Sequence, residues 1–482
     1  MTEFDLVIRN GKVATAADVM NCDIGIRQGQ IVALAAELPT GKQEIDATNK
    51  LVLPGGVDAH CHMDQPMNDG SVMADDFYTG TLSALCGGTT TVIPFACQMK
   101  GNSLKAAVED YHQRATDKAV IDYAFHLIVT DPTPQVLDEE LPELIAKGYT
   151  SFKVYMTYDD LKLSDRALLD VLAVARQEGA FVMIHAENSD CIAWMVQRLA
   201  QLGKISPRYH ATARPQVVER EATHRAIALA ELVDVPILIV HVSGAEAVEQ
   251  IQWAQNRGLR IYAETCPQYL FLTEADLDQP GFEGAKCICS PPPRDKANQQ
   301  VIWDGLCNGV FQVISSDHAP FRYADPQGKQ ICGTHGSFQY VPNGIPGIET
   351  RLPLLFSEGV NQGRIDLNTF VALTATNPAK LYGLYPQKGT IAIGSDADLV
   401  IWDTQRQVTI ANEMLHHNVD YTPYEGIALQ GYPEITISRG EIVFQQGEVF
   451  ASKGRGKFLP CGLSSFARPK QGQGNALPVG EN

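Results

Sequence analysis

The stretch Pro54-Gly55-Gly56-Val57-Asp58-Ala59-His60-Cys61-His62 decides how the rest of the chain is interpreted. Its last six residues predict a short strand, Val57–His62. His60 and His62 alternate along an extended backbone, so both imidazoles point to one face, while Cys61 points to the opposite face and is expected to pack there. A His-x-His pair alone is a weak metal signal, so its meaning depends on what the other strands carry.

Further apolar runs alternate with helical patterns after this point. The expected strands are Val57–His62, Thr89–Phe95, Ile121–Val129, Thr150–Tyr155, Ala180–His185, Pro236–His241, Leu259–Glu264 and Gln312–Asp317. Among the intervening helices, Leu163–Glu178 has one apolar face, with Ser164 as its N-cap and Gly179 at its end. Eight strand-then-helix units over roughly 300 residues predict an α/β fold, a (β/α)₈ TIM barrel.

The two ends of the chain have a different, β-rich texture. Leu6-Val7-Ile8 precedes Asn10-Gly11, a dipeptide typical of hairpins, and Ala397–Trp402 and Glu441–Phe444 read as strands. Neither end could bury a core alone, so residues 1–55 and 386–450 are predicted to form one smaller, discontinuous β-sandwich domain. The barrel then takes residues 56–385. Residues 451–482, with little periodicity, are expected to be a C-terminal arm or disordered.

Composition excludes several classes of partner and site. The 482 residues include 38 Lys+Arg against 56 Asp+Glu, a formal net charge of −18, which argues against nucleic acid or an anionic membrane surface. The 11 cysteines are scattered without a C-x-x-C pair, which excludes a complete disulfide framework and disfavours a thiolate zinc site. No apolar run approaches the ~18 residues of a membrane span, and no secretory signal is visible. We expect a cytoplasmic protein.

Polar side chains occupy the ends of several predicted strands. They are His60, His62, Lys153, His185, His241 and Asp317. In a barrel these ends meet at one rim, where four imidazoles and a carboxylate would suit Zn, Mn, Fe, Co or Ni. Lys153 stands among apolar residues and must be paired or neutralised. It could form a buried salt bridge with Asp317 or a Glu, or CO₂ could convert its amine to an anionic carbamate able to bridge two cations.

These segments closely resemble the motifs of the cyclic amidohydrolases. The matching stretches are Pro54–His62, Ser151-Phe152-Lys153, His185-Ala186-Glu187-Asn188, His241-Val242-Ser243, Glu264–Leu270, Ser316-Asp317-His318 and Gly394–Asp398. The similarity covers nearly the whole chain. It is greatest to the dihydropyrimidinase/D-hydantoinase branch, particularly its phenylhydantoinase-like members.

The resemblance implies a metal-dependent hydrolase that opens hydantoins or dihydropyrimidines to N-carbamoyl amino acids. One ion would be held by His60, His62, Asp317 and N6-carboxylysine at Lys153, and a second by the same carboxylysine with His185 and His241. Zinc is the expected metal, with Mn²⁺, Co²⁺ or another divalent ion as substitutes, and CO₂ modifies the lysine. A metal-bridging hydroxide would attack the ring carbonyl, with Asp317 as general base and acid and Tyr158 stabilising the oxyanion. Tyr158, Ser290 and Asn343 would bind the small cyclic ureide.

Branches of this family differ in the charge of their substrates. Dihydroorotase-like enzymes place an arginine soon after the His-x-His pair, whereas here Met63-Asp64-Gln65-Pro66 follows, and an acid would repel a carboxylate. Allantoinase remains an alternative, although the segments around Lys153, Ser290 and Asn343 are more similar to hydantoinases. Loops 63–73, 95–99 and 155–161 are expected to form an apolar substituent pocket for a 5-substituted hydantoin. Its expected lining is Met63, Met67, Phe95 and Tyr155.

An alternative of another class is a non-catalytic, dihydropyrimidinase-like interaction protein. Such relatives keep the fold but have lost metal ligands, whereas all six positions are filled here. The resemblance also implies a homotetramer, or a homodimer, with the arm reaching a neighbouring subunit.

Overall fold

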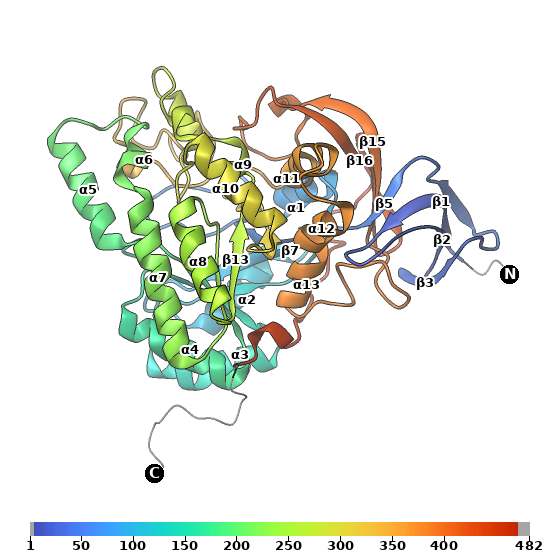
Figure 1. Ribbon diagram of the computed structural model, residues 1–482, viewed down its shortest axis with the longest axis horizontal. Coiled ribbons are helices and arrows are strands. Elements are labelled where there is room, and N and C mark those ends of the chain that lie inside the picture. The colour runs from blue at the N-terminus through green and yellow to red at the C-terminus, as the bar shows by residue number, and fades with distance from the viewer. Residues whose placement is uncertain (1–3, 471–482) are drawn as a thin grey trace, which may run out of the picture.

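The computed structural model describes residues 4–470, and two sheets organise them (Figure 1). The strands of the first sheet are all parallel: β6 (Gly56–Cys61), β7 (Thr89–Cys97), β8 (Asp122–Tyr123), β9 (His126–Ile128), β10 (Ser151–Tyr155), β11 (Phe181–His185), β12 (Ile237–Ile239), β13 (Ile261–Thr265) and β14 (Val313–Ile314). All eight predicted strands therefore form, and the third is split into β8 and β9, which both pair with β7.

Hydrogen bonds between the first and last strands close this sheet into a barrel. The Asp317 N–H donates to the His60 carbonyl at 2.9 Å, and the His62 N–H donates to the His318 carbonyl at 2.7 Å. Asp58 in β6 adds a side-chain bond, because its carboxylate accepts the Ser316 N–H at 3.1 Å. The predicted (β/α)₈ barrel is confirmed.

Helices surround the barrel on its outer side (Figure 1). They are α1 (Phe77–Cys86), α2 (Leu104–Ala115), α3 (Leu141–Ala146), α4 (Asp165–Glu178), α5 (Ser189–Gln201), α6 (Tyr209–Ala213), α7 (Gln216–Val233), α8 (Ala245–Asn256), α9 (Gln268–Phe271), α10 (Lys296–Cys307), α11 (Arg351–Leu355), α12 (Leu367–Val371) and α13 (Asn377–Leu381). The predicted caps of α4 are confirmed, since Ser164 accepts the Ala167 N–H and Gly179 is left-handed with φ 73°.

Short 3₁₀ and π turns complete the helical part of the chain. They are η1 (Val136–Glu140), η2 (Glu274–Leu277), η3 (Glu283–Cys287), η4 (Phe338–Tyr340), η5 (Phe356–Asn361), η6 (Ala372–Thr376), η7 (Asn412–Met414) and η8 (Ser465–Ala467). Within residues 4–470, no helix has both the length and the apolar character that a membrane crossing requires.

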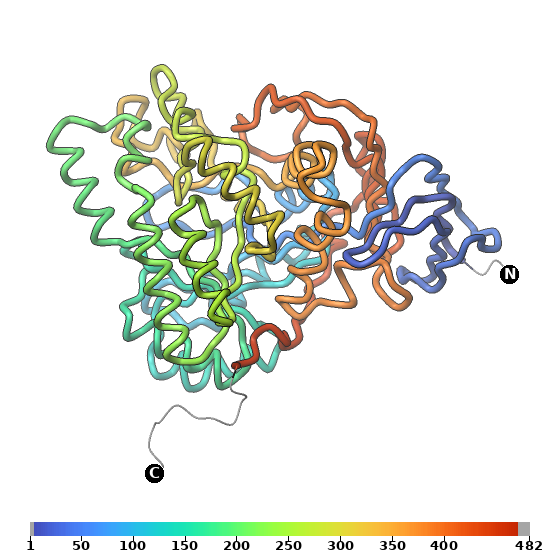
Figure 2. The backbone as a smooth tube through the Cα atoms, viewed as in Figure 1, coloured from blue at the N-terminus to red at the C-terminus, as the bar shows by residue number. Residues whose placement is uncertain are grey.

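The second sheet combines the two ends of the chain into the β-sandwich part of the fold. Its strands are β1 (Leu6–Ala14), β2 (Val19–Arg27), β3 (Gln30–Ala35), β4 (Gln43–Asp46), β5 (Leu51–Pro54), β15 (Leu399–Thr409), β16 (Ala428–Ser438), β17 (Glu441–Gln445) and β18 (Glu448–Val449). Antiparallel pairing of β5 with β15 joins the ends, which lie side by side in Figure 2. The exact domain boundaries given above stay predictions.

Asn10-Gly11 does not form the hairpin that its sequence indicates. Strand β1 continues through both residues with a bulge opposite β2, and Asn10 takes the left-handed conformation with φ 59°. A Cβ at Gly11 would lie 2.5 Å from the Val52 side chain, so close packing from β5 requires the glycine. The turn that joins β1 to β2 lies instead at residues 15–18, where the Thr15 N–H donates to the Asp18 carbonyl at 2.9 Å.

The described part of the C-terminal arm, residues 451–470, packs on its own barrel. The Leu459 N–H donates to the Tyr123 carbonyl at 2.7 Å, and the Tyr123 N–H donates to the Lys457 carbonyl at 3.0 Å. Phe458 packs against the rings of Tyr123 and Phe125. That the 451–482 arm reaches a neighbouring subunit stays a prediction, and its last residues, 471–482, lie outside the described residues.

One buried lysine joins the barrel to the second sheet. Lys388 is 1% exposed, and its Nζ lies 2.7 Å from carboxylate oxygens of both Asp122 in β8 and Asp398 before β15. We expect Lys388→Met to lower the free energy of unfolding by about 3–5 kcal/mol, because the buried Asp398 carboxylate loses its counter-charge and Asp122 is left with Arg439 at 3.3 Å. Equilibrium denaturation measures this.

The matched control is Lys42→Met, which removes an exposed ion pair with Asp5 and should leave stability unchanged within error. Equal stabilities of the Lys388 and Lys42 variants would contradict the structural role of Lys388.

Candidate metal centre

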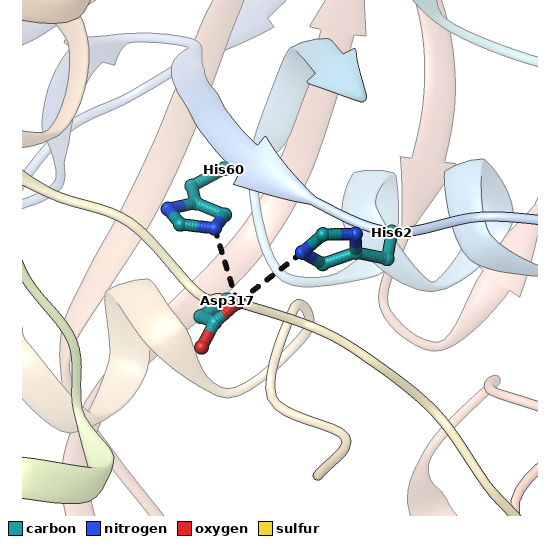
Figure 3. A group of neighbouring side chains, drawn as sticks. All are labelled: His60, His62 and Asp317. Atoms are coloured by element: carbon teal, nitrogen blue, oxygen red, sulfur yellow. Dashed lines mark ion pairs between the residues drawn. The ribbon is translucent and has the colours of Figure 1, made fainter. Parts of the chain in front are cut away.

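Closure of the barrel brings three ligand atoms together at its rim. His60 lies near the end of β6, His62 directly follows that strand, and Asp317 follows β14. The Asp317 Oδ1 atom lies 3.2 Å from His60 Nε2 and 3.5 Å from His62 Nε2, so both rings point at one carboxylate (Figure 3). The three ligand atoms all lie within 4.8 Å of one another. Two imidazoles and a carboxylate at this spacing could hold a divalent ion.

The other three predicted ligand residues lie beside this group. Lys153 comes from the middle of β10, and its Nζ is 2.6 Å from His60 Nε2. His185 ends β11 and His241 follows β12, with ring centroids 4.4 Å apart. The His241 ring lies 5.4 Å from that of His60. All six side chains thus converge, although they come from five strands.

The Lys153 ammonium has an unfavourable environment. The side chain is 1% exposed, and its Nζ faces an imidazole nitrogen and the rings of Phe95 and Tyr155. Burial lowers the pKa of Lys153 to about 8, although the charges of Asp317 and Glu264 oppose the shift. Among the described residues, Lys153 Nζ forms no direct salt bridge with Asp317 or with a glutamate, the two partners considered above; its nearest polar contact is His60 Nε2. The positive charge of the amine can therefore be removed by a covalent modification.

Each of three histidines is oriented by an acceptor outside the centre. His60 Nδ1 lies 2.6 Å from Glu264 Oε1, His62 Nδ1 lies 2.7 Å from Gln65 Oε1, and His185 Nε2 lies 2.7 Å from Glu187 Oε2. A nitrogen that faces such an oxygen carries the proton, so the other ring nitrogen has its lone pair free. This pattern fits imidazoles that bind metal.

Sequence reasoning missed these orienting side chains. Glu264 lies near the end of β13, as His60 and His185 lie near the ends of their strands. A search for polar residues at strand ends could therefore have found it. Glu187 follows His185 by two residues. Arg214 carries no sequence signal, yet its guanidinium lies 2.9 Å from Glu187. Arg214 and His185 outweigh the effect of burial and hold the pKa of Glu187 at about 2.

Three residues of the centre and its cavity have strained backbone conformations. His241, Asp317 and Tyr158 adopt positive φ angles of 38°, 48° and 68°, a region that residues other than glycine rarely adopt. Such conformations persist where the surrounding structure enforces them, and they accompany functional sites. Burial by itself would raise the pKa of Asp317, but His60 and His62 outweigh it and lower that pKa to about 2. The carboxylate is therefore an anion at neutral pH.

A cavity of about 450 Å³ opens above the centre. His62, Lys153, His185, His241 and Asp317 contribute to its lining, as do the three predicted substrate-binding residues Tyr158, Ser290 and Asn343. The Asn343 side-chain amide donates to the Tyr158 hydroxyl at 3.4 Å. Burial raises the pKa of Tyr158 to about 12, so the hydroxyl keeps its proton and can donate it to a ligand.

The predicted substituent pocket is partly wrong in detail. Met67 and Tyr155 line the cavity, whereas Met63 and Phe95 do not. Met63 is fully buried in the core, and Phe95 packs against the rings of His60 and His62 at 4.9 and 5.0 Å. The three predicted loops do contribute, through Met73, Met99 and Leu161. Further apolar lining comes from segments outside the prediction, through Phe321, Ile331 and Val341.

Asp64 does not face a ligand. It is absent from the cavity lining, and its carboxylate pairs with Arg114 at 3.0 Å. Asp64 therefore does not repel a carboxylate on the substrate ring. Within residues 4–470, the cavity lining includes no arginine, and it includes the acids Asp69, Asp159 and Asp160. A carboxylate on the substrate would meet acids without an arginine to bind it.

The chain is similar to known hydrolases over nearly its whole length. A model of the amidohydrolase family matches residues 51–443. D-hydantoinases from Ralstonia pickettii and Geobacillus stearothermophilus are 44% and 46% identical over 456 residues, covering 94% of this chain and 98% and 96% of theirs. The crystal structure of dihydropyrimidinase from Brevibacillus agri NCHU1002 superposes with a TM-score of 0.93 at 45% identity, covering 96% of this chain and 99% of that one.

The contact between His60 and Glu264 generates a prediction. Glu264→Gln replaces the carboxyl group that orients the His60 ring with an amide, so affinity for Zn²⁺ should fall by about 10–100-fold. Metal retained after dialysis against a graded chelator measures this. Glu283→Gln is the control, since Glu283 is an exposed partner of Lys286. If the two variants retain the same amount of metal, Glu264 does not support the centre.

Proposed function

Because this chain belongs to the amidohydrolase family, we propose that it is a divalent-metal-dependent hydrolase that opens the cyclic amide of hydantoins and dihydropyrimidines to N-carbamoyl amino acids. The observation that carries the proposal is the convergence of four imidazoles, Asp317 and Lys153 at the base of one cavity. The similarity to D-hydantoinases over 94% of the chain supports the class of substrate.

The donor set supports two metal positions. His60, His62, Lys153 and Asp317 would hold one ion, and Lys153, His185 and His241 the other, with zinc as the proposed metal and Mn²⁺ or Co²⁺ as substitutes. We propose that Lys153 is an N6-carboxylysine. Its neutral amine attacks CO₂, an N–C bond forms, one proton is released, and the anionic carbamate replaces a buried cation. When bound, the ions polarise the substrate carbonyl and lower the pKa of a water.

The protein's own groups then handle the protons and the developing charge. The anionic Asp317 carboxylate accepts the proton of the attacking water and delivers it to the leaving ring nitrogen, which would otherwise depart as an amide anion. The Tyr158 hydroxyl donates a hydrogen bond to the oxyanion. Ser290 and Asn343 lie beside Tyr158 in the cavity and complement the –CO–NH–CO– edge of the ring.

The lining of the cavity favours an apolar substituent. Met67, Met73, Met99 and Leu161 present thioether and aliphatic groups above the centre. These groups suit the aryl or alkyl group of a 5-substituted hydantoin better than the polar ureido group of allantoin, because the ureido group would lose hydrogen bonds to water there. Allantoin remains the alternative ring to be tested.

We propose a cytoplasmic homotetramer, with a homodimer as the alternative. Exposed apolar side chains support assembly: Trp194 in α5 is 56% exposed and Leu202 just after that helix is 69% exposed. Helix α5 itself lies at the outer edge of the barrel (Figure 1). All 11 cysteines are free, as expected of a reducing compartment.

A substrate panel tests the function directly. Protein prepared with Zn²⁺ and bicarbonate should open hydantoin, phenylhydantoin, dihydrouracil and dihydrothymine faster than allantoin, with the ring-opened carbamoyl product measured by chromatography. A preparation that binds no metal and opens none of these rings would instead indicate the non-catalytic interaction protein.

The matched variant for this panel is Lys153→Ala. It should lose both metal and activity, and short carboxylates added to the buffer should restore part of both. Full activity of Lys153→Ala would remove the carbamate from the proposal.

The oxyanion role predicts a specific kinetic change. Tyr158→Phe keeps the ring but removes the hydroxyl, so kcat should fall about 10²–10³-fold while KM changes little, since the bond strengthens as negative charge develops. Tyr340→Phe is the control, because Tyr340 lines the same cavity but is 59% exposed. Unchanged turnover of Tyr158→Phe would mean that a group other than Tyr158 stabilises the oxyanion.

A further inference from the structure

A single buried lysine connects the two segments that carry Ser290 and Asn343. Lys329 is 0% exposed, and its Nζ donates to the Ile288 carbonyl at 2.9 Å and to the Pro342 carbonyl at 2.7 Å. Ile288 lies two residues before Ser290, and Pro342 lies directly before Asn343. Lys329 is not part of the cavity lining, so it acts from behind the two segments.

Lys329 has no compensating charge. In the described part of the chain, no carboxylate forms an ion pair with its amine, and the ionisable groups near it are the thiols of Cys289 and Cys287 and the His210 ring. Burial lowers its pKa to about 7, against the opposing effect of these thiols. Burying an amine without a counter-ion is costly, so stability alone does not account for this residue. The neutral amine still has two N–H groups, which matches the two carbonyls it reaches.

Other bonds fix the backbone around Ser290. The Gly344 N–H also donates to the Ile288 carbonyl at 3.0 Å, which ties the two segments directly. The His210 ring lies 2.8 Å from the Cys289 carbonyl, and the Tyr269 hydroxyl donates to the Pro291 carbonyl at 2.9 Å. The backbone carbonyls on either side of Ser290 are thus held by hydrogen bonds, which restricts the position of Ser290 itself.

The Ser290 and Asn343 segments have polar groups at the cavity that form no hydrogen bond within the described part of the protein. Within residues 4–470, the hydrogen bonds that fix these segments leave the backbone N–H and C=O groups of Ser290 and Asn343 unused. The Asn343 Oδ1 atom is also buried without a partner. Because both segments border the cavity, these groups can serve a ligand with alternating donors and acceptors.

We infer that Lys329 is a positioning residue that sets the distance between the Ser290 and Asn343 segments, so that both meet the –CO–NH–CO– edge of the ring at once. The inference rests on the proposed function, because that function places a cyclic imide between the segments. Lys329 itself touches neither substrate nor metal. Its contribution is geometric, since two short bonds to carbonyls of separate loops restrict how far those loops can move apart.

The test compares Lys329→Met with two other variants. Methionine has a similar length but no N–H, so KM for hydantoin should rise about tenfold or more, kcat should change less, and bound metal should be retained. Lys329→Gln keeps an amide N–H donor and should raise KM less. Lys388→Met is the matched control: it also removes a buried lysine, yet it should reduce stability with KM within twofold of wild type.

Several results would overturn the inference. They are a KM within twofold of wild type for Lys329→Met, loss of metal together with activity, or failure of both Lys329 variants to fold. If the wild-type protein opens no cyclic ureide, the proposed function fails and the positioning role is judged by hydrogen exchange instead. Amide exchange in residues 287–291 and 341–345 should then accelerate in Lys329→Met but not in Lys388→Met, and equal exchange would refute the role.

Discussion

The hydrogen bonds that close the barrel are the constraint on which the centre depends. The Asp317 N–H bonds to the His60 carbonyl at 2.9 Å, so the end of the last strand lies against the end of the first. That contact sets the Asp317 carboxylate beside both imidazoles. Arg351 is fully buried beneath the closure and donates to the Ile314 carbonyl at 2.9 Å, which fixes β14 from below. Without these closing hydrogen bonds, the first and last strands would lie apart, and Asp317 would not reach the two histidines of the first strand.

Buried charge is the cost of this arrangement, and outer partners offset it. Glu187 is buried beside His185, and Arg214 supplies the opposite charge at 2.9 Å. Glu264 accepts from the His60 ring and also from the His241 N–H at 3.2 Å, so one carboxylate serves two neighbouring ligand residues. The formal net charge of −18 describes the whole chain, whereas the centre itself concentrates imidazoles and a lysine. A neutral cyclic substrate would be little affected by the overall charge.

The walls of the cavity have a different origin from its base. The base is made by strand ends, whereas the walls come from loops that are distant in sequence, such as those of Met67, Leu161 and Ile331. Loop positions depend on specific tertiary contacts, of which the Lys329 bridge and the Asp64–Arg114 pair are two. Substrate preference is therefore set by contacts that no strand-end pattern reveals, while the chemistry is set at the base.

The sequence by itself determined the eight strands and the convergence of six polar residues, five near strand ends and Lys153 within its strand, because a period of two fixes which way each side chain points. It also determined the caps of α4, which depend on residues within one turn. Only the tertiary structure decided that Asn10-Gly11 is a bulge, that Phe95 packs behind the histidines, that Glu264 orients His60, and that Lys329 joins two loops. Each of these depends on a partner more than 30 residues away, or on the packing of several segments, and local patterning carries no information about such partners.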